Sequence, residues 1–95
     1  MKTIAVLGTL DTKGEEHAYV AEIIRSRGHR TLLIDVGCLT PPVVKPDISR
    51  DEVAAAGHVD LTELVALKDR GRSVTAMAHA SARLVEQLVT EGRID

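Results

Sequence analysis

The sequence predicts an α/β fold built on an open parallel sheet, and three observations carry this prediction. Two short apolar runs of the kind found in buried strands lie near the N-terminus, with one amphipathic helical segment between them. Glycines stand where each of these segments should end. Three further helical segments follow, and the last is the longest. The predicted order is β-α-β-α-α-α, the first two strands of a Rossmann-like sheet with its helices.

The first strand is predicted over Lys2–Leu7, where four consecutive apolar residues are typical of a strand buried on both faces. Gly8 ends this strand. The first helix is predicted over Glu15–Arg27, because its apolar residues recur at helical spacing and Gly28 is a typical helix stop.

The second strand is predicted over Thr31–Val36, again as a short apolar run. The segment Cys38–Pro46 should form a stiff, extended connection, because each of its prolines fixes φ and lacks a backbone donor. The resulting β-α-β unit is typical of the opening of a parallel sheet.

Three helices are predicted in the second half of the chain. Ser49–Glu52 match a capping box that begins a short helix ending near Ala56, and Asp60–Asp69 repeat this pattern with Asp as the cap. The longest helix is predicted over Ser73–Glu91. Its expected buried stripe, at a spacing of three and four residues, consists of Val74, Met77, Ala78, Ser81, Val85 and Leu88.

Composition excludes several classes of function. Twelve Lys and Arg against 14 Asp and Glu give a net charge of −2, so the chain has no overall basic footprint for nucleic acid. A single aromatic residue, Tyr19, offers no platform on which bases could stack. One cysteine, Cys38, excludes an internal disulfide, and neither a signal peptide nor a membrane span is visible. We therefore expect a cytoplasmic protein.

The last residues predict that the domain continues. Gly92 ends the long helix, and in α/β folds the next strand usually follows such a stop. A two-stranded sheet is marginally stable in water. We therefore expect residues 1–95 to be the N-terminal part of one α/β nucleotide-binding domain, truncated before strand three, and we expect a homo-oligomer that covers the sheet edges. The alternative is a complete small domain whose two strands are covered by helices.

The segment between the first strand and the first helix is the best candidate for a binding loop. Ligands of open parallel sheets bind outside the carboxyl ends of the strands. Gly8 and Gly14 let the backbone approach a ligand, Thr9 and Thr12 offer hydroxyls, and Lys13 offers an ammonium group. Together with the free N–H groups and the dipole of the helix N-terminus, these groups suit a phosphate.

A second interpretation of this segment needs no ligand. The pattern is neither a Walker loop nor a dinucleotide fingerprint. Thr12 and Glu15 fit a capping box that would satisfy the helix end by itself. Asp11, Glu15 and Glu16 also bring three carboxylates against the one ammonium group of Lys13, so a phosphate would need Mg²⁺ or basic groups from elsewhere.

Asp35 ends the second strand and has two interpretations. An acidic residue at this place can accept hydrogen bonds from a ribose hydroxyl in nucleotide-binding folds. The slightly favoured alternative is an Asp that caps the following turn at Gly37.

Other candidate residues carry weaker signals. His17 lies near the proposed pocket but is typical of an exposed helical histidine. Cys38 has no activating partner in the sequence, which favours a structural thiol. Arg70 and Arg72 could reach an anion but are more typical of a solvated pair, and Ser73 has no nucleophile motif around it.

Four stretches carry a resemblance to a known family: Ile4–Glu16, Leu33–Gly37, Pro46–Val53, and Asp69–Gly71 before an Ala-rich helix. The chain resembles, over essentially its whole length, the family whose namesake is the N-terminal ATP-binding domain of the tomato mosaic virus resistance protein. The resemblance implies a three-layer α/β fold in two subdomains, ATP or a related nucleotide as ligand, and longer proteins with a TIM-barrel-like partner domain. It also implies that a glycine-rich loop beyond residue 95 supplies a second phosphate-binding element.

The leading prediction is an ATP-binding domain fragment with a phosphate-binding loop after the first strand. Backbone N–H groups and Lys13 would bind phosphate, the threonine hydroxyls would hydrogen-bond to it, and Asp11 would hold Mg²⁺ through water or orient the loop. One alternative is a non-catalytic oligomerisation or interaction module. Another is part of an enzyme for a small phosphorylated metabolite, although no nucleophile or general base can be named. The predicted binding residues are Gly8, Thr9, Asp11, Thr12, Lys13, Asp35 and Gly37.

Overall fold

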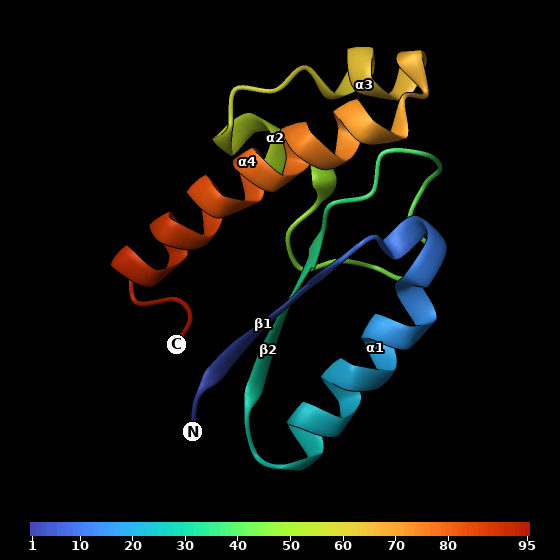
Figure 1. The fold of residues 1–95 in the computed structure, drawn as a ribbon. Coiled ribbons are helices and arrows are strands. Elements are labelled where there is room, and N and C mark those ends of the chain that lie inside the picture. The colour runs from blue at the N-terminus through green and yellow to red at the C-terminus, as the bar shows by residue number, and fades with distance from the viewer.

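The computed structural model describes residues 1–95 and confirms the α/β class and the order of the elements (Figure 1). The two strands pair in parallel, with Thr3 opposite Arg30 and Gly8 opposite Asp35. The elements are β1 (Thr3–Gly8), α1 (Leu10–Ser26), β2 (Arg30–Asp35), α2 (Arg50–Ala56), α3 (Leu61–Leu67) and α4 (Arg70–Thr90).

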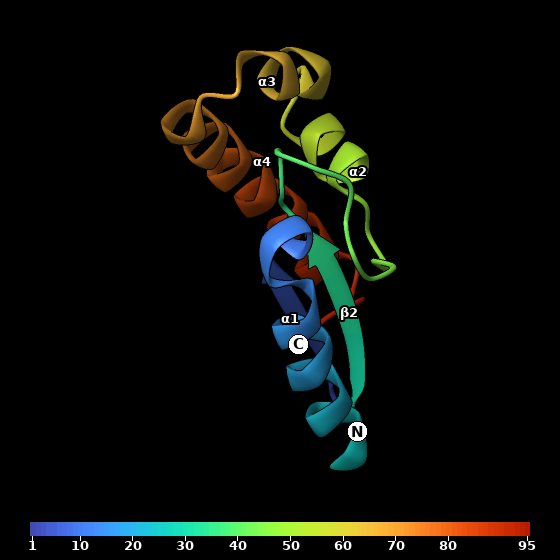
Figure 2. The ribbon, with the colours of Figure 1, turned by 90° about the vertical axis from the view of Figure 1, so that its right-hand side faces the viewer.

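The sheet lies between two helical layers, with α1 on one face and α2 and α4 on the other (Figures 1 and 2). Val6 and its register partner Leu33 belong to a small core with α1. Ala5, Leu32 and Ile34 contact the larger core beneath α2 and α4. Alternation of side chains along a strand explains this division, because successive residues point to opposite faces.

Helix α1 begins earlier than the sequence predicts. Its first residue is Leu10 rather than Glu15, its N-cap is Thr9, and Lys13 interrupts the helical geometry with φ −125° and ψ 24°. The expected Thr12–Glu15 capping box is therefore wrong. Thr12 lies inside α1, and its hydroxyl bonds to that of Thr9 at 3.1 Å. Thr9, the N-cap, makes no capping bond with its own side chain. The segment predicted as a loop is largely the first turn of the helix.

Helix α4 also begins before its predicted start. Asp69 is the N-cap, and its Oδ1 accepts the N–H of Arg72 at 3.1 Å. The buried stripe is turned relative to the prediction, so that Val74 is 60% exposed and Ala78 is also exposed. Packing against the end of α2 explains this rotation of α4, because Gly57, the C-cap of α2, packs directly on Ala80. The positions that are buried are Ser73, Met77, Ala80, Ser81, Leu84 and Leu88.

The short helices follow their local sequence signals. Ser49 Oγ accepts the N–H of Glu52 at 3.2 Å, and the Glu52 carboxylate accepts the N–H of Ser49 at 3.2 Å, so the predicted capping box is confirmed. Asp60 caps α3 through the N–H of Glu63. Helix α3 ends at Leu67, because Lys68 adopts the left-handed conformation with φ 52°.

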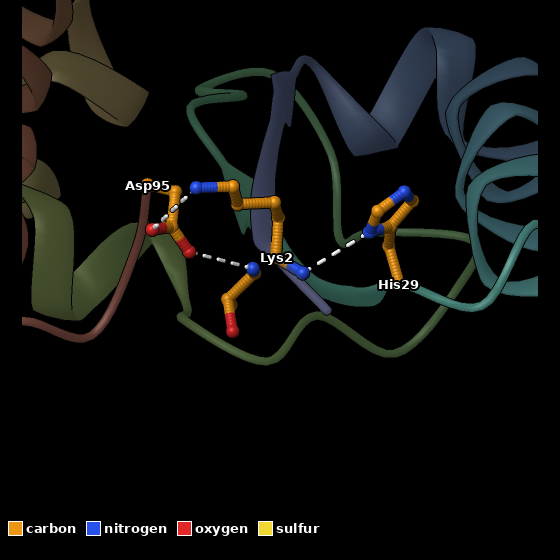
Figure 3. Close-up of polar contacts among 4 residues, drawn as sticks. Lys2, His29 and Asp95 are labelled. Carbon is orange, nitrogen blue, oxygen red and sulfur yellow. Dashed lines mark hydrogen bonds and ion pairs between the residues drawn. The ribbon is translucent and has the colours of Figure 1, made fainter.

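The two outer edges of the sheet have different neighbours. Ile48 forms a parallel bridge with Ile34 on the outer edge of β2. Asp95 lies beside the start of β1, where its N–H donates to Thr3 O at 2.9 Å. Its carboxylate accepts the N–H of Thr3, also at 2.9 Å (Figure 3). Lys2 adds an ion pair to Asp95 and donates its N–H to His29 Nδ1 at 3.0 Å (Figure 3).

None of the four helices combines the length and the apolar character needed to cross a membrane.

The packing of α2 on α4 predicts the effect of a single methyl group. In a Gly57→Ala variant the new Cβ would lie 2.5 Å from Ala80 Cβ and 2.6 Å from Ala80 Cα, so the helices must separate. We expect the free energy of unfolding to fall by about 1–3 kcal/mol, measured by urea unfolding. Gly71→Ala is the matched control, because its Cβ would meet nothing closer than Asp69 Oδ1 at 3.5 Å. Equal stability of the two variants would contradict this packing.

Candidate functional site

A cavity of about 300 Å³ lies where the two parallel strands end. Three segments form its walls: the first turn of α1, the segment after β2 and the first turn of α4. This is the end of an open parallel sheet at which ligands bind. Larger hollows of about 490 and 620 Å³ lie between α3 and α4 and along the surface of α4, and neither contains a predicted site residue. The cavity is lined by Thr9, Asp11, Thr12, Lys13, Val36, Cys38, Leu39, Arg70, Ser73 and Val74.

The structure brings four of the seven predicted binding residues to this cavity: Thr9, Asp11, Thr12 and Lys13. The other three, Gly8, Asp35 and Gly37, lie outside its lining. These three shape the walls of the cavity from behind.

Asp35 is buried at the end of β2, with 1% of its surface exposed. Its Oδ1 accepts the N–H of Gly37 at 2.8 Å and the N–H of Leu10 at 3.2 Å. The first of these bonds is the local cap that the sequence favours. The second satisfies the first free N–H of α1, which explains why the helix begins at Leu10. The ribose contact of Asp35 stays a prediction.

Asp11 holds the segment after β2 in place from the opposite side. Its Oδ2 accepts the N–H groups of Leu39 at 2.9 Å and of Thr40 at 3.2 Å. Its carboxylate also packs against Gly37, where a Cβ would lie 2.6 Å from Asp11 Oδ1. These contacts correspond to the loop-orienting role that the sequence analysis considered. Oδ1 of Asp11 is buried and makes no hydrogen bond.

The polar groups of the α1 wall remain accessible. Lys13 Nζ lies 3.6 Å from Glu16 Oε2 in a pair whose side chains are more than half exposed, at 64% and 62%. An exposed pair of this kind contributes about 0–1 kcal/mol and is readily exchanged for another anion. The hydroxyls of Thr9 and Thr12 bond to each other, and each keeps further hydrogen-bonding capacity.

His17 takes a structural position beside the cavity. Its Nδ1 lies 2.7 Å from Lys13 O, and its ring covers Gly8 so closely that a Cβ on this glycine would clash with it. His17 is not among the residues that line the cavity. The glycine after β1 therefore makes room for a histidine side chain.

Cys38 is buried in the cavity wall, with 6% of its surface exposed. Burial raises the pKa of its thiol above the ordinary value, while the neighbouring Ser73 hydroxyl and the positive charge of Arg50 lower it by smaller amounts. The thiol is therefore protonated and weakly nucleophilic at neutral pH, as a structural thiol should be.

The third wall of the cavity was not predicted from the sequence. Arg70, Ser73 and Val74 come from the first turn of α4, and neither Arg70 nor Ser73 was favoured as a site residue. The Asp69 N-cap was the available signal, because it places Arg70 at the first helical position. No group of three or more His, Cys, Asp or Glu side chains is arranged to hold a metal ion.

A family model described as the N-terminal domain of the uncharacterised protein family UPF0261 matches residues 2–95. The chain belongs to this family. The chain spans about a fifth of the length of the curated relatives it matches. No solved structure matches it with comparable significance.

Three relatives illustrate the similarity. The chain is 41% identical over 90 residues to a UPF0261 protein of Clostridium tetani, covering 95% of this chain and 22% of the relative. It is 42% identical over 85 residues to a UPF0261 protein of Rhizobium meliloti, covering 90% and 21%. It is 32% identical over 92 residues to a UPF0261 protein of Brucella suis, covering 97% and 22%.

These findings correct the resemblance stated from the sequence. The matching family is UPF0261, its relatives are bacterial proteins of that name, and nothing links the chain to the tomato mosaic virus resistance protein. The homo-oligomer and the barrel-like partner domain stay predictions.

The capping role of Asp35 predicts a large loss of stability on truncation. Asp35→Ala leaves the N–H groups of Leu10 and Gly37 without their acceptor in a buried place. We expect the free energy of unfolding to fall by about 3 kcal/mol, measured by denaturant unfolding. Asp51→Ala is the control, because Asp51 is exposed on α2. Similar losses in both variants would refute the capping role.

The raised pKa of the Cys38 thiol predicts slow alkylation with a strong dependence on pH. Because the thiolate is the reactive form, the rate with iodoacetamide should stay below that of a free cysteine at pH 8 and rise as the pH increases toward the raised pKa. Mass spectrometry of the folded protein measures the rate, and the same protein in urea is the control. A folded rate equal to the rate in urea would contradict burial of the thiol.

Proposed function

We propose that this domain binds a nucleotide through its phosphates, with ATP as the representative ligand. One observation carries the proposal: the first turn of α1, with Thr9, Thr12 and Lys13, forms a wall of the cavity at the carboxyl ends of the parallel strands. The first N–H groups of a helix have no internal acceptors, and the helix dipole adds partial positive charge at this end. The arrangement therefore suits an anion.

The side chains of the α1 wall match phosphate oxygens. Lys13 supplies an ammonium group that only an exposed glutamate accompanies. The Thr9 and Thr12 hydroxyls lie together, so a phosphate oxygen can accept from one while the other donates to its neighbour. Asp35 takes the N–H of Leu10, and the N–H groups of Asp11 and Thr12 follow it in the first turn.

The carboxylate of Asp11 on the same wall favours a phosphate that arrives with a cation. Asp11 Oδ1 is buried and has no hydrogen-bond partner. Carboxylate oxygens and phosphates are the groups through which proteins usually hold Mg²⁺, with several waters retained on the ion. We therefore take the Mg²⁺ complex of ATP as the ligand, because the cation offsets the negative charge that Asp11 brings to this wall.

The size of the cavity limits which part of the nucleotide it encloses. Small-molecule pockets usually measure about 300–1,000 Å³, and this cavity, at about 300 Å³, lies at the lower end. In the proposal it encloses the phosphate end, and the base lies outside it.

The proposal predicts that ATP affinity depends on the α1 wall. Lys13→Met removes the ammonium group and Thr12→Val removes a hydroxyl of similar shape, so each should weaken binding of ATP with Mg²⁺ about tenfold. Isothermal titration calorimetry of the intact protein measures the dissociation constant. Lys45→Met is the matched control, because Lys45 is exposed and does not line the cavity.

Two results would overturn the proposal. One is the absence of ATP binding by the intact protein. The other is tight binding that survives replacement of both Asp11 and Lys13 by alanine, since Asp11 holds the segment after β2 in place and Lys13 supplies the ammonium group of the proposed site.

A further inference from the structure

The cavity has a second charged wall, which faces the first turn of α1. Arg70, Ser73 and Val74 form it, and all three belong to the first turns of α4. Helix α4 has 21 residues, so a full helix dipole ends here with its positive side toward the cavity. Whether this helix end can hold an anion depends on the side chains around it.

Ser73 carries a hydroxyl that the protein leaves unsatisfied. The side chain is 6% exposed, its Oγ is buried and makes no hydrogen bond of normal geometry, and it lines the cavity. Its polar neighbour is the Cys38 thiol, which is a weak donor and a weak acceptor. Buried polar groups without partners are rare, and each one calls for an explanation.

Another serine on the same helix makes the hydrogen bond that Ser73 lacks. Ser81 is 9% exposed, and its Oγ donates to Ala78 O at 3.0 Å within the preceding turn. Helical serines commonly satisfy themselves in this way. The Ser73 hydroxyl makes no such bond, although it sits on the same helix at similar burial. The hydroxyl is therefore not used within the helix, and it lies beside the Cys38 thiol in the cavity wall.

Arg70 supplies the charge that this wall needs. Its side chain is exposed at the rim of the cavity, and the two ion pairs of the protein involve Lys2 and Lys13 instead. A guanidinium group matches two phosphate oxygens at once. Arg72, two residues further on, points to the groove between α3 and α4 and does not line the cavity.

We propose that the first turn of α4 is a second phosphate-binding element, in which Ser73 donates to one phosphoryl group and Arg70 pairs with its charge. The inference rests on the proposed function, in which α1 binds the other phosphoryl group. Because two walls each hold one group, the ligand class is a nucleoside diphosphate or triphosphate, and a monophosphate fills only half of the site.

The test compares two serines and two arginines on α4 in the intact protein. Calorimetry with ADP and with AMP, each with Mg²⁺, gives the dissociation constants for Ser73→Ala, Ser81→Ala, Arg70→Gln and Arg72→Gln. We expect Ser73→Ala and Arg70→Gln to weaken ADP about tenfold and AMP much less. The Ser81 and Arg72 variants should bind both nucleotides as the unmodified protein does.

A thermal readout separates binding from structure. Ser73→Ala removes a buried hydroxyl whose polar neighbour is the Cys38 thiol, a weak acceptor, so the melting temperature without ligand should change little. Ser81→Ala removes a hydrogen bond and should lower it slightly. Weaker ADP binding together with an undiminished melting temperature supports a ligand-binding role for Ser73.

Several outcomes would overturn the inference. ADP binding in Ser73→Ala equal to that in Ser81→Ala refutes the role of Ser73, and equal weakening of ADP and AMP refutes the assignment of a second phosphoryl group. If ADP binding depends on Lys13 but not on Ser73 or Arg70, the proposed function stands and this inference fails. If neither nucleotide binds, both fail.

Discussion

The architecture of the site depends on one buried carboxylate. Oδ1 of Asp35 accepts N–H groups from Leu10 and Gly37, so the end of β2 fixes both the start of α1 and the turn that leaves the sheet. In the opposite direction, Asp11 of α1 holds the segment after β2, because its carboxylate accepts the N–H groups of Leu39 and Thr40. These crossed bonds set two walls of the cavity in place within the protein itself, and charge-assisted bonds of this kind are about twice as strong as neutral ones.

The strands and the order of the elements could be predicted because their signals are local. An apolar run ended by a glycine predicts a strand, and the Ser49–Glu52 box predicts the start of α2 correctly. The start of α1 could not be found in this way, because the side chain that accepts its first N–H is Asp35, 25 residues away. The capping box of Thr12 and Glu15 was predicted instead, because capping rules consider only neighbours in sequence. The prediction of the buried face of α4 was wrong for a related reason, since contact with Gly57, far away in sequence, affects the rotation of the helix.

The residues of the site also fall into a group that local sequence predicts and a group that it does not. Thr9, Asp11, Thr12 and Lys13 were predictable, because residues after a parallel strand must lie at its carboxyl end. Arg70 and Ser73 were not, because only the tertiary structure brings the first turn of α4 to the same end of the sheet (Figure 1). Gly8 and Gly37 were predicted as ligand contacts, but they make room for His17 and for the Asp11 carboxylate. A glycine signals close approach, and sequence alone does not name the approaching group.

The unsatisfied polar atoms of the protein bear on the ligand that we propose. The buried side-chain atoms without a partner are Asp11 Oδ1, Asp35 Oδ2 and Ser73 Oγ, and their residues gather at the carboxyl end of the sheet. Two of these atoms are carboxylate oxygens, which accept donors or cations, whereas Ser73 and the two helix ends favour an anion. A simple anion would meet the carboxylates, and a simple cation would meet Lys13, Arg70 and the helix dipoles. The proposed metal-bound polyphosphate carries both charges at short range, so it suits the Asp11 carboxylate as well as Lys13, Arg70 and the helix ends. The mixed polarity of the walls thus fits one composite ligand better than two separate ions.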